Sequence, residues 1–215
     1  MKVSPVEIWK KIWPVLKKNY SREETFLNHK NEWELLVAVI LSAQMTDEGV
    51  NKISEELFKK FPHPESMVKS SVLEIAKYIK KVNYYKTKSK YLKKTAEIIV
   101  SEFNGKVPDN VSDLMKLSGV GRKTAVAVLA NGFNKYVGIA VDTHIIRFVK
   151  RFELSKEAEA SKIEQDLLQI IPQKNWNAAS YAIKEYGRRE GRARNWKPEE
   201  DPVWLSFKKL NNKYI

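Results

Sequence analysis

The stretch Leu117-Ser118-Gly119-Val120-Gly121-Arg122-Lys123-Thr124-Ala125 carries the strongest local signal in the chain. Two glycines separated by one residue permit a tight turn between two helices and leave backbone N–H groups uncovered. These groups, with the positive end of the following helix, form a site for a phosphate oxygen. Such a contact carries no base information, so it suits a protein that must bind any sequence. An ordinary turn is the alternative, and the flanking Leu117, the Arg122-Lys123 pair and the apolar run 125–130 argue against it.

Lys123 lies in the first turn of the helix that follows the glycines. The helix dipole and neighbouring Arg122 both disfavour its protonated form. A neutral amine at this place could attack a sugar C1′ and form a Schiff base. The alternative is a solvated lysine with no special role. Lys123 is therefore a candidate nucleophile that needs a partner.

A carboxylate further along the chain is the candidate partner of Lys123. Asp142 follows the small apolar run Ile139-Ala140-Val141 and could cap a helix, which is the usual role of Asp at such a position. A capping carboxylate can still project one oxygen toward a substrate, so the two roles are compatible. His144 is expected to be a structural histidine with local hydrogen bonds.

Composition points to a polyanionic partner. Lys and Arg number 39 against 26 Asp and Glu, which leaves a net charge of +13, and nucleic acid is the commonest partner of so basic a chain. A ribosome-associated or membrane-surface protein would have a similar charge. The absence of cysteine excludes disulfides, thiolate metal sites and a cysteine nucleophile, and it fits a cytoplasmic protein. The segment Met1–Tyr20 carries lysines and no long apolar run, so we expect neither a signal peptide nor a membrane span.

Helical periodicity runs through almost the whole chain, which predicts an all-α fold. The clearest apolar face is formed by Trp33, Leu36, Val37, Ile40 and Leu41. Local start and stop signals predict further helices over 46–61, 88–103, a short one opened by Asp109 and Ser112, 122–132, one capped by Asp142, 157–170 and 176–189.

Several separate motifs together resemble one known family. The stretch 117–125, followed by Val141-Asp142-Thr143-His144, is similar to the endonuclease III branch of the helix-hairpin-helix DNA glycosylases. Leu41-Ser42-Ala43-Gln44-Met45-Thr46-Asp47 and Val50-Asn51-Lys52 resemble that branch's second signature at its usual distance upstream. The resemblance runs from Trp33 to Tyr186. Each motif alone is weak, and their order makes them specific together.

The resemblance implies two helical domains with the active site in the cleft between them. The first is 25–136, which carries the hairpin, and the second is 1–24 plus 137–215. It also implies a base-excision repair glycosylase with AP lyase activity, acting on oxidised pyrimidines in double-stranded DNA and on abasic sites. The damaged nucleotide would be flipped out toward Lys123, which would act through a Schiff base and β-elimination, and Asp142. The enzyme is expected to be a monomer, nucleoid-associated if the source is prokaryotic.

The family also suggests which residues touch DNA. Gln44 matches the residue that fills the gap left by the flipped base, and Tyr84 falls where the family places a wedge in the duplex. Lys86 and Lys88 would bind phosphates around that wedge. The remaining predicted contacts are in the hairpin and in a second basic stretch: Leu117, Gly119, Val120, Gly121, Arg122, Arg192 and Arg194.

The C-terminus departs from the family. Most of this branch ends in a four-cysteine iron–sulfur loop, whose ligand positions fall on Gly191, Pro198, Asp201 and Phe207 in ungapped register. None of these can bind such a cluster, so no metal and no cofactor are expected. Trp196, Trp204 and Phe207 could supply apolar packing in its place.

Two other functions remain open on sequence grounds. The same fold could act on mismatched, deaminated or oxidised purine bases, since base specificity depends on pocket shape and not on these motifs. A non-catalytic DNA-binding protein could use the hairpin for phosphates alone. The Lys123–Asp142 pair favours an enzyme, because pure phosphate binding needs neither residue.

Overall fold

The computed structural model describes residues 3–22, 25–190 and 196–210. Every regular element within these ranges is a helix, which confirms the all-α prediction. The chain divides into two compact units. We call Thr25–Val137 the hairpin unit, and Met1–Glu24 together with Gly138–Ile215 the terminal unit. None of the helices in the described ranges is long and apolar enough to cross a membrane.

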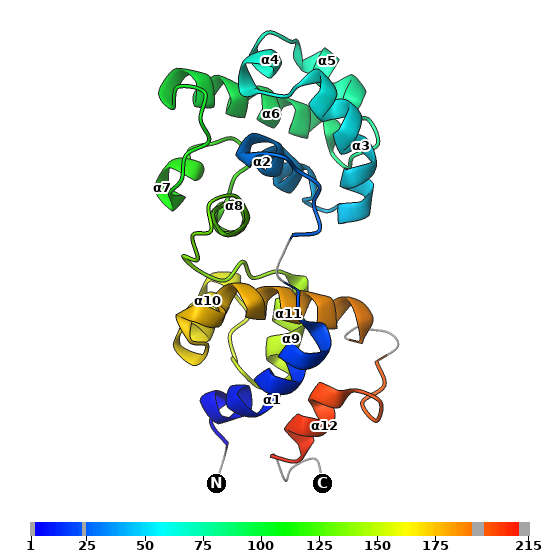
Figure 1. The fold of residues 1–215 in the computed structure, drawn as a ribbon, viewed down its shortest axis with the longest axis vertical. Coiled ribbons are helices and arrows are strands. Elements are labelled where there is room, and N and C mark those ends of the chain that lie inside the picture. The colour runs from blue at the N-terminus through cyan, green and yellow to red at the C-terminus, as the bar shows by residue number, and fades with distance from the viewer. Residues whose placement is uncertain (1–2, 23–24, 191–195, 211–215) are drawn as a thin grey trace. The chain divides into compact units, whose positions relative to one another are not determined.

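The hairpin unit is built around one buried helix, α2 (Glu32–Leu41), which packs against α3, α6 and α8 (Figure 1). Its core contains Leu36, Val37 and Leu41 from the predicted apolar face, together with apolar residues of the surrounding helices. The surrounding helices are α3 (Asp47–Lys60), α4 (Pro64–Val68), α5 (Val72–Tyr78), α6 (Tyr85–Glu102), α7 (Val111–Leu114) and α8 (Arg122–Gly132).

Helix starts in this unit follow the local signals with two differences. Thr46 caps α3 as expected, its side chain accepting from the Gly49 N–H at 3.1 Å. The cap of α7 is Asn110, not Asp109, because the Asn110 side chain accepts from the Asp113 N–H. Helix α6 begins at Tyr85, earlier than the predicted Lys88, directly after Tyr84 in a left-handed conformation.

The terminal unit joins the two ends of the chain. Helix α1 (Pro5–Tyr20) packs against α11 (Trp176–Arg189) and α12 (Pro202–Lys208) through buried Ile8, Ile12 and Leu16. Between them in sequence lie α9 (Thr143–Arg151), α10 (Ala160–Ile170) and the short 3-10 turn η1 (Gln173–Asn175). Helix α10 starts after the predicted residue 157, and α11 has the predicted bounds.

Asp201 forms a polar centre in the C-terminal segment, at one of the register positions of the family's cluster ligands. It is 1% exposed and caps α12 by accepting from the Val203 and Trp204 N–H groups at 2.9 and 3.0 Å. Its other oxygen accepts from Trp196 Nε1 at 2.8 Å and from the Tyr186 hydroxyl.

Aromatic rings pack around this polar centre. Trp204 contacts Trp196 and Phe207, with ring centroids 5.0 and 5.3 Å apart. The Arg151 guanidinium lies over Trp196, 3.9 Å from the ring centroid, and donates to the Tyr186 hydroxyl at 2.8 Å. The three aromatic residues singled out from the sequence thus pack together. A set of Gly, Pro, Asp and Phe at the four ligand positions supplies no thiolate and does not fit an iron–sulfur cluster.

Candidate DNA interface and active site

The glycine turn is a closed hairpin that ends at an uncapped helix. The Val120 N–H donates to the Leu117 carbonyl at 3.2 Å, and Gly119 between them has a φ of +80°. Helix α8 then begins at Arg122 behind Gly121, with no side-chain cap hydrogen bond. Uncapped N–H groups at a helix start, with the helix dipole behind them, favour an anion. This is the geometry that the sequence predicted for a phosphate site.

Helix α6 supports this hairpin from behind. Thr95 Oγ1 donates to the Ser118 carbonyl at 2.9 Å. A Cβ on Gly119 would lie 2.8 Å from Cδ2 of Tyr91, which is closer than real Cβ atoms approach. Gly119 is therefore required twice, for its left-handed backbone and for the close approach of the Tyr91 ring.

The predicted hairpin contacts divide into surface and core. Gly119, Gly121, Arg122 and Lys123 are exposed. Leu117 and Val120 are buried and belong to the hydrophobic core of the hairpin unit. Their side chains hold the turn in place, and DNA contact at these two positions stays a prediction for the backbone.

Asp142 caps α9, as the sequence predicts. Its Oδ1 accepts from the N–H groups of His144 and Ile145, both at 2.9 Å. Oδ2 accepts no hydrogen bond from any residue that the structure describes. The carboxylate is thus fixed through one oxygen.

His144 lies beside Asp142 in a close contact between α9 and α11. Arg147 Nη2 lies 3.1 Å from His144 Nδ1, and the ring packs against Gly187. Burial lowers the pKa of His144, and the neighbouring Arg147 and Arg188 act in the same direction against the carboxylate of Asp142. These contacts agree with the structural role expected for this histidine.

The two candidate catalytic residues belong to different units. Lys123 is exposed in the first turn of α8 in the hairpin unit. Asp142 is partly buried at the start of α9 in the terminal unit. Their pairing stays a prediction.

The predicted gap-filling residue is hydrogen-bonded to the residue that precedes the predicted wedge. Gln44 and Tyr84 both have left-handed backbones, with φ of 57° and 59°, and both side chains are exposed, Tyr84 to 65%. Asn83 Nδ2 donates to the Gln44 carbonyl at 2.6 Å. Sequence reasoning missed this contact, since nothing local to Asn83 indicates a partner so distant in the chain.

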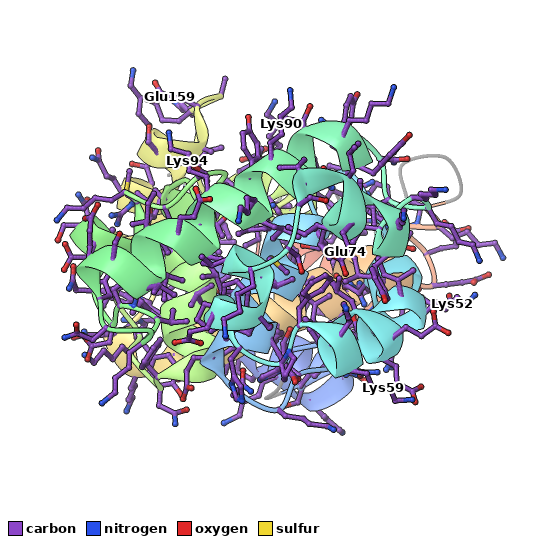
Figure 2. The ribbon with its side chains drawn as sticks, turned by 90° about the horizontal axis from the view of Figure 1, so that it is seen from above. Lys52, Lys59, Glu74, Lys90, Lys94 and Glu159 are labelled. Atoms are coloured by element: carbon purple, nitrogen blue, oxygen red, sulfur yellow. The ribbon has the colours of Figure 1, made fainter. Side chains whose placement is uncertain are left out.

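The predicted phosphate contacts Lys86 and Lys88 have opposite surroundings. Lys86 is exposed, as are Lys90 and Lys94, which project from the outer face of α6 (Figure 2). Lys88 is only 5% exposed, and its Nζ donates to the carbonyls of Leu41 at 2.7 Å and Ala43 at 2.6 Å. Burial lowers the pKa of the Lys88 ammonium. The prediction of Lys88 as a phosphate contact is wrong, because its ammonium is directed into the protein.

Two further predicted contacts, Arg192 and Arg194, lie outside the described residues. Within the ranges that the structure describes, no three His, Cys, Asp or Glu side chains gather in a group that could hold a metal ion.

Comparison with known proteins agrees with this arrangement. Residues 37–173 match the family model described as HhH-GPD superfamily base excision DNA repair protein. Endonuclease III of Synechocystis sp. is 39% identical over 174 residues, which cover 81% of this chain and 80% of that protein. Endonuclease III of Bacillus subtilis is 34% identical over 185 residues, covering 86% and 84%.

A solved structure extends the similarity to nearly the whole chain. It is described as a trapped endonuclease III–DNA covalent intermediate in an estranged-adenine complex, and it superposes with a TM-score of 0.89 at 30% identity. The match covers 98% of this chain and 100% of that one. With the glycine hairpin, the exposed Lys123 and the Asp142 cap already in place, these findings show that the chain belongs to the HhH-GPD superfamily of base excision DNA repair proteins.

Proposed function

We propose that this chain is a base-excision repair DNA glycosylase with AP lyase activity, in which Lys123 is the nucleophile. Its substrates are oxidised pyrimidines in double-stranded DNA and abasic sites. The observation that carries the proposal is an exposed lysine in the first turn of α8, directly behind an uncapped glycine hairpin. Its relatives are named endonuclease III, and one such enzyme has been trapped covalently on DNA. The substrate implies that the enzyme works where chromosomal DNA lies.

The binding step uses groups that read no sequence. The hairpin holds a phosphate, while Gln44 and Tyr84 enter the duplex where the damaged nucleotide leaves it. Lys86 and the other exposed lysines of α6 add charge around the wedge. Lys123 and Asp142 then act on the flipped nucleotide.

The chemical step forms and breaks bonds at one sugar. The neutral amine of Lys123 attacks C1′, the bond from C1′ to the base breaks, and the base leaves with a proton. The C1′–O4′ bond of the sugar ring then breaks, O4′ takes a proton, and the amine nitrogen and C1′ become a protonated imine. Loss of a proton from C2′ then expels the 3′ phosphate oxygen, which cleaves the strand. Asp142 stabilises the positive charge that develops on the sugar and assists the proton transfers.

Borohydride trapping tests the nucleophile. Reduction of the imine should give a stable protein–DNA adduct with the wild-type enzyme, and Lys123→Gln should give neither adduct nor strand cleavage, because an amide cannot form an imine. Binding should fall little, since one charge is a small part of the phosphate term. Lys59→Gln is the matched control, because Lys59 is an exposed lysine of the hairpin unit that lies on α3 and not on α6.

The control should bind, cleave and form the adduct as the wild type does. A Lys123→Gln protein that still cleaves abasic DNA and still forms the adduct would assign the nucleophile to another amine, with Lys184 the next to replace. A panel of duplexes, each with one defined lesion and assayed for base release, tests the substrate class separately.

A further inference from the structure

Two residues with left-handed backbones lie together at the start of α6, and neither is glycine. Gln44 follows the end of α2, and Tyr84 precedes α6. A left-handed conformation is unfavourable for a residue with a Cβ, and it persists where surrounding contacts fix it. The contacts that fix these two residues are therefore informative.

Asn83 supplies the first of these contacts. Its Nδ2 donates to the Gln44 carbonyl at 2.6 Å, although the two residues are far apart in sequence. Asn83 is exposed, so the hydrogen bond spans the surface between the loop at Gln44 and the turn at Tyr84. The backbone of the gap-filling residue is thus tied to the neighbour of the wedge.

Lys88 supplies the second contact from inside the unit. Its backbone N–H donates to the Tyr84 carbonyl at 3.0 Å, while its Nζ donates to the carbonyls of Leu41 and Ala43. These two carbonyls stand on either side of Ser42, at the end of α2 and just before Gln44. Carbonyls at a helix end carry partial negative charge and favour a cation. Lys88 thus touches both segments at once.

A buried ammonium lowers the stability of the folded protein unless its hydrogen bonds compensate for the lost hydration. Burying a charge without full compensation destabilises a protein, and an apolar side chain of similar volume is often tolerated as well or better. The acceptors of Lys88 are backbone carbonyls of the very loop that leads to Gln44. Its directional hydrogen bonds define where that loop lies, which an apolar side chain cannot do.

We propose that Lys88 and Asn83 are positioning residues that fix Gln44 relative to Tyr84, so that both side chains enter the opened duplex together. This inference rests on the proposed roles of Gln44 and Tyr84 in DNA binding. We call the side chains of Lys88, from α6, and Asn83, from the turn before it, the positioning frame. Neither Lys88 nor Asn83 needs to touch the DNA.

The test compares the full-length protein with Lys88→Met, Lys88→Arg, Asn83→Ala and Lys86→Met. Each is titrated onto two duplexes, one undamaged and one with a tetrahydrofuran abasic analogue opposite 2-aminopurine. The fluorescence of 2-aminopurine reports whether side chains have entered the gap. At saturating protein, a variant that is only less stable should give the same fluorescence change as the wild type. Methionine keeps the length of lysine and removes the donors, and Lys86→Met is the exposed control on the same helix.

Lys88→Met should lower the ratio of lesion affinity to undamaged affinity about tenfold and abolish most of the fluorescence change. Asn83→Ala should give a smaller loss of the same kind, and Lys88→Arg should restore part of the ratio. Lys86→Met should weaken binding to both duplexes by the same factor, and it should reduce the slope of log K against log salt by about 0.9. An unchanged ratio and fluorescence in both Lys88→Met and Asn83→Ala, or a Lys88→Met loss that is equal on both duplexes, would overturn the proposal. If Lys88→Met does not fold, Asn83→Ala decides alone, because its side chain is exposed.

Two further variants separate this inference from the function on which it rests. Gln44→Ala and Tyr84→Ala, measured on the same duplexes, should reduce lesion binding and the fluorescence change. If neither has an effect, the proposed roles of Gln44 and Tyr84 are wrong. If both have the effect while Lys88→Met and Asn83→Ala match the wild type, the roles stand and the positioning frame is wrong.

Discussion

In the proposed mechanism Asp142 combines a structural and a chemical role in one carboxylate, whose Oδ1 caps α9. Asp142→Asn should lower single-turnover base release by about 10²–10⁴, because the negative charge near the sugar is lost. The melting temperature should stay close to the wild-type value, since Asn caps a helix about as well as Asp. Activity and melting temperature falling together would show that the residue acts only through the fold.

Gly119 and Gly121 differ in what a methyl group would meet. At Gly119, alanine would hold a φ of +80° and press on the Tyr91 ring, whereas nothing lies within 4 Å of a Cβ at Gly121. Gly119→Ala should therefore lower the melting temperature by several degrees, since about 1 kcal/mol of backbone strain already shifts a mid-sized domain by 2–4 °C. Gly119→Ala should also weaken binding to lesion-containing and undamaged duplexes by the same factor. Gly121→Ala should melt as the wild type does, and equal destabilisation by both would refute this reading of the turn.

The sequence predicted single residues well where the signal was local. Asp142 stands directly before a helix, so its capping role could be predicted from neighbours in the chain. Lys88 was predicted to bind phosphate together with Lys86, but it is buried. Its burial depends on the carbonyls of Leu41 and Ala43, which only the folded unit brings near. Long-range acceptors of this kind leave no trace in local sequence.

Helix α6 shows how one element can support two binding features. Lys88, Tyr91 and Thr95 are spaced so that they lie on one side of the helix. The first reaches the Gln44 loop, and the other two hold the hairpin. The predicted start of this helix was too late, because Tyr84 has none of the usual capping side chains. Its start depends on a left-handed residue that composition does not reveal.

The close contact of Gly187 in α11 with His144 in α9 means that alanine at position 187 should destabilise the protein, although alanine usually stabilises a helix. Alanine is better than glycine in a helix by about 1 kcal/mol, so Gly187→Ala would be expected to stabilise α11. A Cβ at Gly187 would lie 3.0 Å from both Cβ and Cγ of His144, and still closer to the ring nitrogen. Gly187→Ala should therefore lower the melting temperature. The double variant with His144→Ala should recover most of the loss, and simple additivity of the two changes would contradict the contact.

At the scale of the molecule, the net charge of +13 predicts salt-dependent binding with little sequence preference. If about five phosphates are neutralised, the slope of log K against log salt on undamaged duplex should be roughly −4 to −5. Titrations at several salt concentrations measure this slope, with random-sequence duplexes as the comparison. A slope near zero would show that the charge does not serve DNA binding.

The overall architecture was more predictable than its C-terminal segment. Helical periodicity is repeated along the chain, so the all-α fold does not depend on any one contact. The arrangement around Asp201 joins Tyr186, Trp196 and Arg151 from three separate segments. The sequence identified aromatic residues suited to packing there, but a buried carboxylate at their centre cannot be inferred without the donors that surround it.

The terminal unit is built from both ends of the chain, which has a consequence for its biosynthesis. Helix α1 is translated before the hairpin unit, whereas its partners α11 and α12 are translated after it. The hairpin unit is one uninterrupted stretch and can complete its core in the meantime. Until α11 and α12 have been translated, the apolar face of α1 therefore stays exposed to water, and chaperones can bind it. This face consists of Ile8, Trp9, Ile12 and Leu16.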